Sequence, residues 1–379
     1  MSSTGVVGTQ WRGEVASWGA VQPDDRSAAL EWWVAADDRW HTPALEPSVR
    51  QTRLEGTPVT ETRVRVPTGD AVQRVWSVAD HGGITVVEVT NESTLPIAVA
   101  FSHRGVLTER PIPNAPIEGI DLPDGAFVLP IGHAASVRVG IAHTPGAATG
   151  TLPTGLPSVT QVVHGWTTLT ERASRLVLPD AWASHVLDVT ATRCDLLLGD
   201  GIPTAADDPA GFAVALGELV RMGEPADAWL PELVDAVAAI ARAGWAWDND
   251  IALAAAGRVL AAAGEERALR DLARIAGRRM APAPRPAEAP EGVRRVAWVE
   301  RALVSGATIL PDGWPAGWLG QSWEAYGLPT LGTSTVSLGV RWHGERPAVL
   351  WEQAGDPVTL SAFGWTSADP TGETLWPAP

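Results

Sequence analysis

The spacing of apolar residues changes along this chain, and that change constrains the fold more than any other feature. In the segment VTETRVRV, Val64 and Val66 share one face, whereas Arg63 and Arg65 share the other. This two-residue period is typical of half-buried β-strands. Similar short segments recur with turn residues between them, which predicts an N-terminal antiparallel β-sandwich over residues 1–150.

The apolar spacing becomes helical after residues 144–157, a stretch rich in Gly, Pro and Thr that we expect to be a linker with few buried contacts. Further along, Phe212 and Leu219 recur at i and i+7, on one face of a helix. Asp207 or Asp208 can cap this helix, since a proline follows at the first helical position.

Helical spacing marks several further segments, among them 158–176 and 180–199. The short turns between them predict antiparallel neighbours, so we expect an all-α antiparallel helical domain over 158–280. A Pro- and Ala-rich linker then leads to one more helix, 293–304. The predicted fold is therefore α+β and multidomain, with a C-terminal segment, 293–379, whose β-hairpin packs back on the fold.

That hairpin is predicted by the segment VSLGVRWHGERPAVLWE, residues 336–352. Leu338 and Val340 alternate with polar or small residues before Gly344, which suits a tight turn. Pro347 opens the return strand, where a missing amide hydrogen is tolerated.

The charge of the chain limits its partners. The formal net charge is −16, and all 28 basic residues are arginine. An acidic chain repels phosphate backbones and anionic membranes, so we expect no nucleic-acid partner and no membrane partner. No apolar run reaches the ~18 residues that span a bilayer. No secretory signal is visible either, which favours a cytoplasmic location.

Cysteine and histidine usage gives no indication of a metal site or another cofactor. The single cysteine, Cys194, can form neither an intramolecular disulfide nor a cysteine-based zinc site, and we expect it to be buried in a helix. The eight histidines show no ligand spacing. The oligomeric state stays open.

Two segments, VTNESTLPIAVAF (89–101) and GQSWEAYGLPT…VSLGVRWHGERPAVLWE (320–352), carry a family resemblance. With the order of strands, helices and terminal hairpin, they resemble bacterial glycoside hydrolases of the glucoamylase-like and glycogen-debranching-like type. The resemblance implies a β-sandwich followed by an α/α toroid, and a carbohydrate ligand. The helical region has room for about half of the helices in such a toroid, so the resemblance implies a shortened one.

Glycoside hydrolysis uses two carboxylates, about 5 Å apart for retention and about 6.5–9.5 Å apart for inversion. The segment WAWDND places Asp248 and Asp250 beside Trp245 and Trp247. Indoles stack on sugar rings, and an apolar neighbour raises the pKa of a carboxyl group, as a general acid requires. The alternative is that Asp248 or Asn249 caps the following helix.

A second candidate loop, GWPAGWLGQSWEAYG (313–327), surrounds Glu324 with residues that can bind a sugar: Trp314, Trp318, Trp323 and Tyr326. We expect Glu324, Trp318 and Trp323 to line a pocket between the helical domain and the C-terminal strands. The alternative is that these aromatic residues only pack the strands against the helices.

Glu352 ends the hairpin and completes the candidate catalytic residues, which are Glu324, Asp248, Asp250 and Glu352. No G-x-x-x-x-G-K-[ST], G-x-S-x-G or H-E-x-x-H motif occurs. Two hypotheses follow. Either a glycoside-hydrolase-like protein acts on or binds an α-glucan or oligosaccharide in a Trp-lined cleft, or a non-catalytic scaffold or regulatory protein keeps the fold. Whether the chain is an enzyme stays open.

Overall fold

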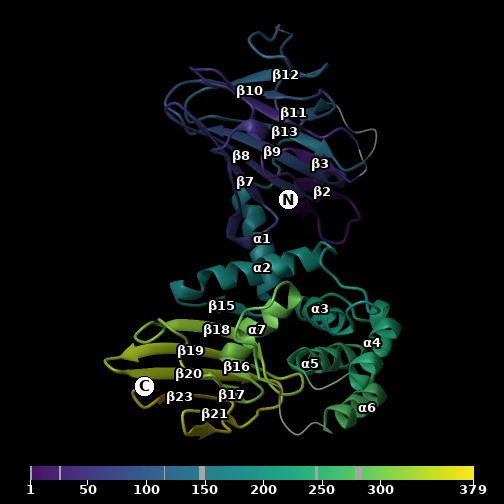
Figure 1. The fold of residues 1–379 in the computed structure, drawn as a ribbon, viewed down its shortest axis with the longest axis vertical. Helices are drawn as coiled ribbons and strands as arrows, with labels where there is room; N and C mark the ends of the chain where they lie inside the picture. The colour runs from purple at the N-terminus through teal and green to yellow at the C-terminus, as the bar shows by residue number, and fades with distance from the viewer. Residues whose placement is uncertain (1, 25–26, 115, 145–149, 244–245, 278–283) are drawn as a thin grey trace. The chain divides into compact units, whose positions relative to one another are not determined.

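The chain divides into two compact units, Met1–Thr167 (unit 1) and Thr168–Pro379 (unit 2). Unit 1 is built mainly of strands, and unit 2 combines helices with strands, so the protein is of mixed α+β type, as the sequence indicated. This is a computed structural model, which describes residues 2–24, 27–114, 116–144, 150–243, 246–277 and 284–379 (Figure 1).

Unit 1 contains three sheets, with strand orders β1-β2-β3, β12-β10-β4-β5 and β14-β11-β13-β9-β8-β7-β6. The strands pair antiparallel, except for β11 with β14. Their bounds are β1 Ser2–Gly5, β2 Arg12–Val15, β3 Val21–Pro23, β4 Trp32–Ala35, β5 Trp40–His41, β6 Arg50–Arg53, β7 Thr60–Val66, β8 Gly69–Val78, β9 Ile84–Asn91, β10 Ile97–Phe101, β11 Leu107–Thr108, β12 Phe127–Ile131, β13 Ser136–Ala142 and β14 Gly150–Thr151.

The four-stranded and seven-stranded sheets of unit 1 share one apolar core. Phe101 and Leu129 from the first sheet lie in the same buried cluster as Val64 and Val87 from the second. Along β7 the predicted alternation is confirmed, because Val64 is buried and Arg65 is exposed. Burial of one such side chain stabilises the fold by roughly 1.5–3 kcal/mol, so the alternating pattern holds the two sheets together.

The segment 144–157 differs from the bare linker that its composition suggested. Leu152 and Leu156 are buried against Ile84 in a second apolar cluster of unit 1. The prediction of few buried contacts is therefore wrong for this part of the segment, because two leucines among the turn residues supply apolar surface. Residues 145–149 lie outside the described residues.

The described helices of unit 2 lie mainly before residue 304, and α1 crosses the boundary between the units. Their bounds are α1 Val159–Glu171, α2 Ala183–Leu197, α3 Pro209–Met222, α4 Leu230–Arg242, α5 Trp247–Ala262, α6 Glu266–Ala276 and α7 Val293–Leu303. Short 3-10 turns occur in both units, at Pro43–Leu45, Leu54–Gly56, Asp80–Gly82, Asp180–Trp182 and Asp227–Trp229.

Local sequence signals account for where several of these helices begin. Asp208 caps α3, its carboxylate accepting a hydrogen bond of 2.9 Å from the Gly211 amide, and Pro209 follows at the first helical position. The predicted cap is thus confirmed. Cys194 is buried in α2, also as predicted. The predicted end of the helix over 158–176 is wrong, because α1 ends at Glu171.

Unit 2 contains a five-stranded sheet, β15-β18-β19-β20-β23, and a four-stranded sheet, β16-β17-β21-β22. In Figure 1 the helices α3 to α6 gather beside the strands, with α7 between them. The strand bounds are β15 Arg175–Val177, β16 Val304–Ser305, β17 Thr308–Ile309, β18 Trp323–Pro329, β19 Thr335–His343, β20 Arg346–Ala354, β21 Leu360–Ala362, β22 Trp365–Ser367 and β23 Thr371–Leu375.

The predicted hairpin is confirmed as β19 and β20, which pair from Thr335↔Ala354 to His343↔Arg346. The inward residues of the five-stranded sheet pack with the four-stranded sheet in one core that includes Trp323, Leu338 and Leu360. Its opposite face is therefore free to carry polar groups, and that face is called the outer face below.

Candidate functional site

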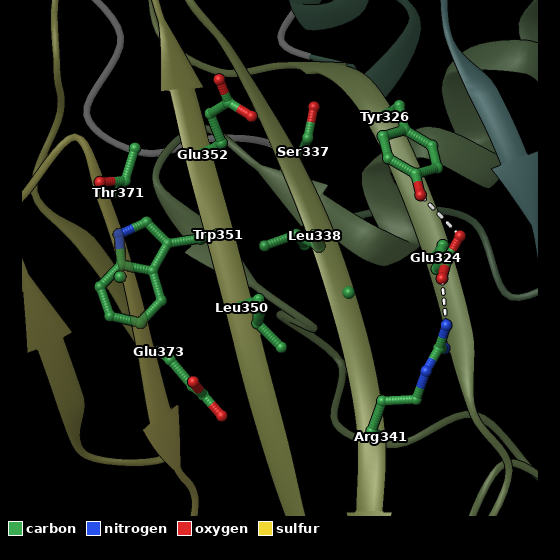
Figure 2. Close-up of a pocket in the computed structure, with 12 residues that line it drawn as sticks. Glu324, Tyr326, Ser337, Leu338, Arg341, Leu350, Trp351, Glu352, Thr371 and Glu373 are labelled. Atoms are coloured by element: carbon green, nitrogen blue, oxygen red, sulfur yellow. Dashed lines mark hydrogen bonds and ion pairs between the residues drawn. The ribbon is translucent and has the colours of Figure 1, made fainter.

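The outer face of the five-stranded sheet is hollowed into an open depression of about 750 Å³, the sheet groove (Figure 2). Its side chains come from β18, β19, β20 and β23. Those that bear on its chemistry are Glu324, Tyr326, Arg341, Leu350, Glu352 and Glu373. Strand alternation explains this composition, because Trp323 and Ala325 are buried on one side of β18 while Glu324 lies on the other.

A β-bulge shapes one edge of the sheet groove. Pairing of β18 with β19 shifts between Ala325 and Leu328, so Tyr326 and Gly327 together oppose the single residue Ser337. Gly327 has a φ of 68°, a conformation that favours glycine, and its amide donates to the Ser337 hydroxyl at 3.2 Å. The bulge leaves both Glu324 and Tyr326 on the outer face, where they meet.

Glu324 is held as a carboxylate by its neighbours. The Tyr326 hydroxyl donates to it at 2.6 Å, and Arg341 pairs with its other oxygen. These hydrogen bonds, from Tyr326 first and Arg341 second, lower the pKa of Glu324. The Arg175 guanidinium also lies 5.5 Å from the centre of the Tyr326 ring. Glu324 is therefore an acceptor of hydrogen bonds at neutral pH.

The floor of the sheet groove is bare backbone at Gly339. A Cβ atom added there would meet nothing within 4 Å. Gly339 pairs with Glu324 on one side and with Leu350 on the other, so a carboxylate and an apolar side chain border the floor. Tyr326 is 38% exposed and Leu350 is 45% exposed. The groove thus offers both charged and apolar contacts to a ligand lying along the sheet.

The three carboxylates of the sheet groove do not converge on one point. Glu324 and Glu373 lie in one cross-strand row with Gly339 and Leu350 between them. Three strand spacings separate their backbones by about 14 Å. Figure 2 shows Glu352 and Glu373 directed toward different ends of the groove. This geometry favours contacts with several groups of a ligand over attack on one bond.

Asp248 and Asp250 lie in the first turn of α5, and each has an arginine partner on α7. Asp248 accepts from Arg294 at 2.9 Å, and Asp250 pairs with Arg301. The residue that precedes the first helical position is Ala246, so neither aspartate nor Asn249 is the cap that the alternative reading expected. These ion pairs tie α5 to α7, and the two aspartates do not face each other across the sheet groove.

Most of the predicted sugar-binding tryptophans prove to be structural. Trp318, Trp323 and Trp247 are buried, the first two inside the core beneath the sheet. They cannot stack on a sugar, and the predicted pocket built from Trp318 and Trp323 is wrong. Trp314 is partly buried and packs parallel to Phe363, with ring centres 5.7 Å apart. Trp245 lies outside the described residues.

Of the predicted residues, the sheet groove brings together Glu324, Tyr326 and Glu352. Sequence reasoning missed Gly339, Arg341 and Glu373, which also line it. The signal was present in the hairpin, since Gly339 and Arg341 alternate with the core residues Leu338 and Val340. What the sequence did not provide was the cross-strand register that sets them beside Glu324.

A second set of charges in unit 2 lies away from water and is called the buried ion cluster: Arg193, Glu218, Arg221 and Glu300. Arg193 donates to Glu218 at 3.0 Å and to Glu300 at 2.8 Å. Arg221 donates to Glu218 at 2.5 Å and to Glu300 at 2.8 Å. Burial raises the pKa of Glu300, but Arg221 and Arg193 outweigh it and hold that pKa at about 2. The cluster joins α2, α3 and α7.

Within the described ranges, no group of three His, Cys, Asp or Glu side chains is arranged to hold a metal ion. Judged by length and hydropathy, the described helices include no membrane-spanning segment. A scan against models of protein families finds no match to this chain, and a search of curated proteins finds none either.

Proposed function

We propose that this protein is a glycoside-hydrolase-like scaffold that binds an oligosaccharide in the sheet groove without cleaving it. The observation that carries the proposal is the groove itself. Glu324, Glu352 and Glu373 line it together with Tyr326 and the bare floor at Gly339.

The chemistry of the groove matches that of a sugar chain. Hydroxyl groups of a sugar donate to carboxylates, and charge-assisted hydrogen bonds of this kind are stronger than neutral ones. The less polar ring faces of sugars pack on aromatic and aliphatic surface, which Tyr326 and Leu350 supply. Because the groove is open along the sheet, it suits an extended ligand such as an α-glucan segment.

Binding without turnover is favoured by the state of the carboxylates. A glycosidase needs one protonated acid whose pKa is raised and a second carboxylate opposite to it. In the sheet groove the pKa of Glu324 is lowered by Tyr326 and Arg341. The side chains of Glu352 and Glu373 also point toward different ends of the groove (Figure 2). These observations support the non-catalytic hypothesis over the hydrolytic one.

We also propose the finer architecture that the sequence suggested, namely an antiparallel β-sandwich in unit 1 and a shortened α/α toroid in unit 2. The shared core of two sheets supports the first part. The second part is supported by α2 to α7 preceding the C-terminal strands. An experimental structure of unit 2 would test whether α2 to α7 follow a toroid path.

Isothermal titration of malto-oligosaccharides and of other neutral oligosaccharides tests the proposed function. We expect Gly339→Arg to fill the floor and weaken binding by more than about tenfold, with little change in melting temperature, since a Cβ atom at this position meets no other atom within 4 Å. Glu345→Gln, at the exposed turn of the same hairpin, is the matched control and should bind as the unmodified protein does.

Two results would overturn the proposal. One is equal binding by the Gly339→Arg variant and the unmodified protein, which would exclude the sheet groove as the site. The other is release of reducing ends from any bound oligosaccharide by the purified protein, which would establish hydrolysis and reject the non-catalytic assignment.

A further inference from the structure

Arg258, on α5, is a cation without a partner at the edge of the buried ion cluster. Its Nε atom is fully buried and makes no hydrogen bond, and among the described residues no carboxylate forms an ion pair with it. Burial, followed by the nearby charge of Arg221, lowers the pKa of Arg258 to about 10. The residue as a whole is only partly buried, so the rest of its guanidinium stays accessible to an anion that could act as its counter-ion.

The surrounding charges do not supply that counter-ion. The carboxylates of Glu218 and Glu300 each accept hydrogen bonds from both arginines of the buried ion cluster. Arg301 is likewise paired, with Asp250. The two glutamates and the two cluster arginines balance one another, so Arg258 is a surplus positive charge in this part of unit 2.

A small cavity borders Arg258. It is lined by Glu218, Arg258, Glu300 and Thr330 among others, and its volume of about 40 Å³ is room for roughly three water molecules or for one carboxylate group. The Thr330 hydroxyl is also buried and has no hydrogen-bond partner. The cavity therefore joins an unpaired cation to an unpaired hydroxyl donor, which is the combination that an anion requires.

A larger cavity of about 770 Å³ adjoins the small one, because both are lined by Ala254, Arg301, Gly306 and Thr330. One wall of the larger cavity is apolar and comes from α5 and α6, with Leu253, Leu269 and Leu272. Its volume lies within the range of ligand-binding cavities in proteins. Two adjoining spaces, one beside the unpaired Arg258 and one with an apolar wall, match a molecule with an anionic head and an apolar body.

We propose that unit 2 binds a small organic carboxylic acid, whose carboxylate pairs with Arg258 and Thr330 and whose apolar body lies in the larger cavity against the wall formed by α5 and α6. This site is separate from the sheet groove, since the two share no lining residue. No bond is made or broken there. The ligand supplies the negative charge that the surrounding side chains do not provide.

Calorimetric titration with three probes tests each part of the proposal. Octanoate carries both head and body, acetate carries only the head, and 1-octanol carries only the body. We expect octanoate to bind more tightly than either fragment. Equal affinity for octanoate and 1-octanol would overturn recognition of the carboxylate, and equal affinity for octanoate and acetate would overturn the apolar part of the site. Absence of octanoate binding would overturn the whole proposal.

Two substitutions locate the site. Arg258→Met keeps an unbranched apolar stem but removes the guanidinium and its charge, and it should weaken octanoate binding by about tenfold to hundredfold. Thr330→Val replaces only the hydroxyl and should weaken binding by about threefold to tenfold. This variant tests the site if Arg258→Met does not fold. Unchanged affinity in both variants would overturn the assignment of the site.

Two controls complete the experiment. Arg270→Met removes an arginine of α6 whose side chain is 67% exposed, and it should leave octanoate binding unchanged. Gly339→Arg should also leave it unchanged, because that substitution fills the sheet groove. Loss of octanoate binding in the Gly339→Arg variant would show that the acid occupies the groove, and would overturn a separate site.

Discussion

Unit 2 contains two sets of arginine and glutamate that differ chiefly in their exposure to water. In the buried ion cluster the side chains of Arg193 and Glu300 are 2% and 3% exposed. In the sheet groove those of Arg341 and Glu324 are 51% and 25% exposed. Charges removed from water depend on each other for stabilisation, whereas exposed charges remain solvated. Pairs of the same residue types therefore stabilise the fold in the buried ion cluster, whereas in the sheet groove they stay accessible to a ligand.

The largest expected effect is on the buried ion cluster. Glu300→Gln removes a charge that Arg193 and Arg221 both need, and it should lower the free energy of unfolding of unit 2 by roughly 3–5 kcal/mol. Denaturant unfolding measures this. The exposed Glu345→Gln should change stability by less than about 0.5 kcal/mol. A loss below about 1 kcal/mol for Glu300→Gln would break the comparison, since exposed pairs already reach that value.

The acid dependence of stability sharpens this prediction. The pKa of Glu300 falls from an ordinary value of 4.5 to about 2 in the folded protein. A depressed folded-state pKa stabilises the fold above the unfolded value, and that stabilisation is lost as the pH falls from about 4.5 toward 2. The stability difference between the unmodified protein and Glu300→Gln should therefore be constant near neutral pH and shrink below pH 4.5.

An intermediate effect is expected at Asp208, which is partly exposed, as Glu324 is, but also caps a helix. Its carboxylate caps α3 and also pairs with both terminal nitrogens of Arg294 on α7, at 2.6 and 2.7 Å. Asp208→Ala should lower the melting temperature through a loss of about 1–2 kcal/mol. Asp207→Ala, one residue earlier and outside the cap, is the control. Similar losses from the two substitutions would contradict the role assigned to Asp208.

The smallest expected effect on stability is in the sheet groove. Glu324→Gln keeps the shape of the side chain and should change the free energy of unfolding by less than about 0.5 kcal/mol. The same substitution removes a charged acceptor and should weaken oligosaccharide binding by about threefold to tenfold. The melting temperature is measured beside the binding titration. A large fall would mean that Glu324 stabilises the fold as Glu300 does, and would contradict the difference proposed between the two sites.

Features set by neighbouring residues were predicted well from the sequence. The alternation of Leu338 and Val340 with polar or small residues predicted the hairpin. An aspartate before Pro209 predicted the start of α3. Alternation within β18 also separates Trp323 and Ala325 from Glu324 and Tyr326. The dense aromatic loop nevertheless suggested a binding pocket, because a local pattern does not reveal which face of a strand the rest of the fold covers.

The candidate sites depend on contacts between distant parts of the chain, which explains why most of their members were not predicted. Glu373 reaches the sheet groove only because β23 pairs with β20. Arg258 and Thr330 line one cavity only because α5 and the turn after β18 both border it. Burial of Glu218 and Glu300 beside Arg258 likewise requires three helices to pack, and no spacing along the sequence encodes it.

The bulge in β18 has a consequence for how the sequence of this strand can change in length. Trp323 and Leu328 are five positions apart, and in a regular strand they would point to opposite faces, yet both are buried. The extra residue at Tyr326–Gly327 corrects the parity. Deleting one of these two residues would restore regular pairing and still leave Leu328 inside. This strand can therefore lose one residue at the bulge and change its outer face while the residues of the core stay buried.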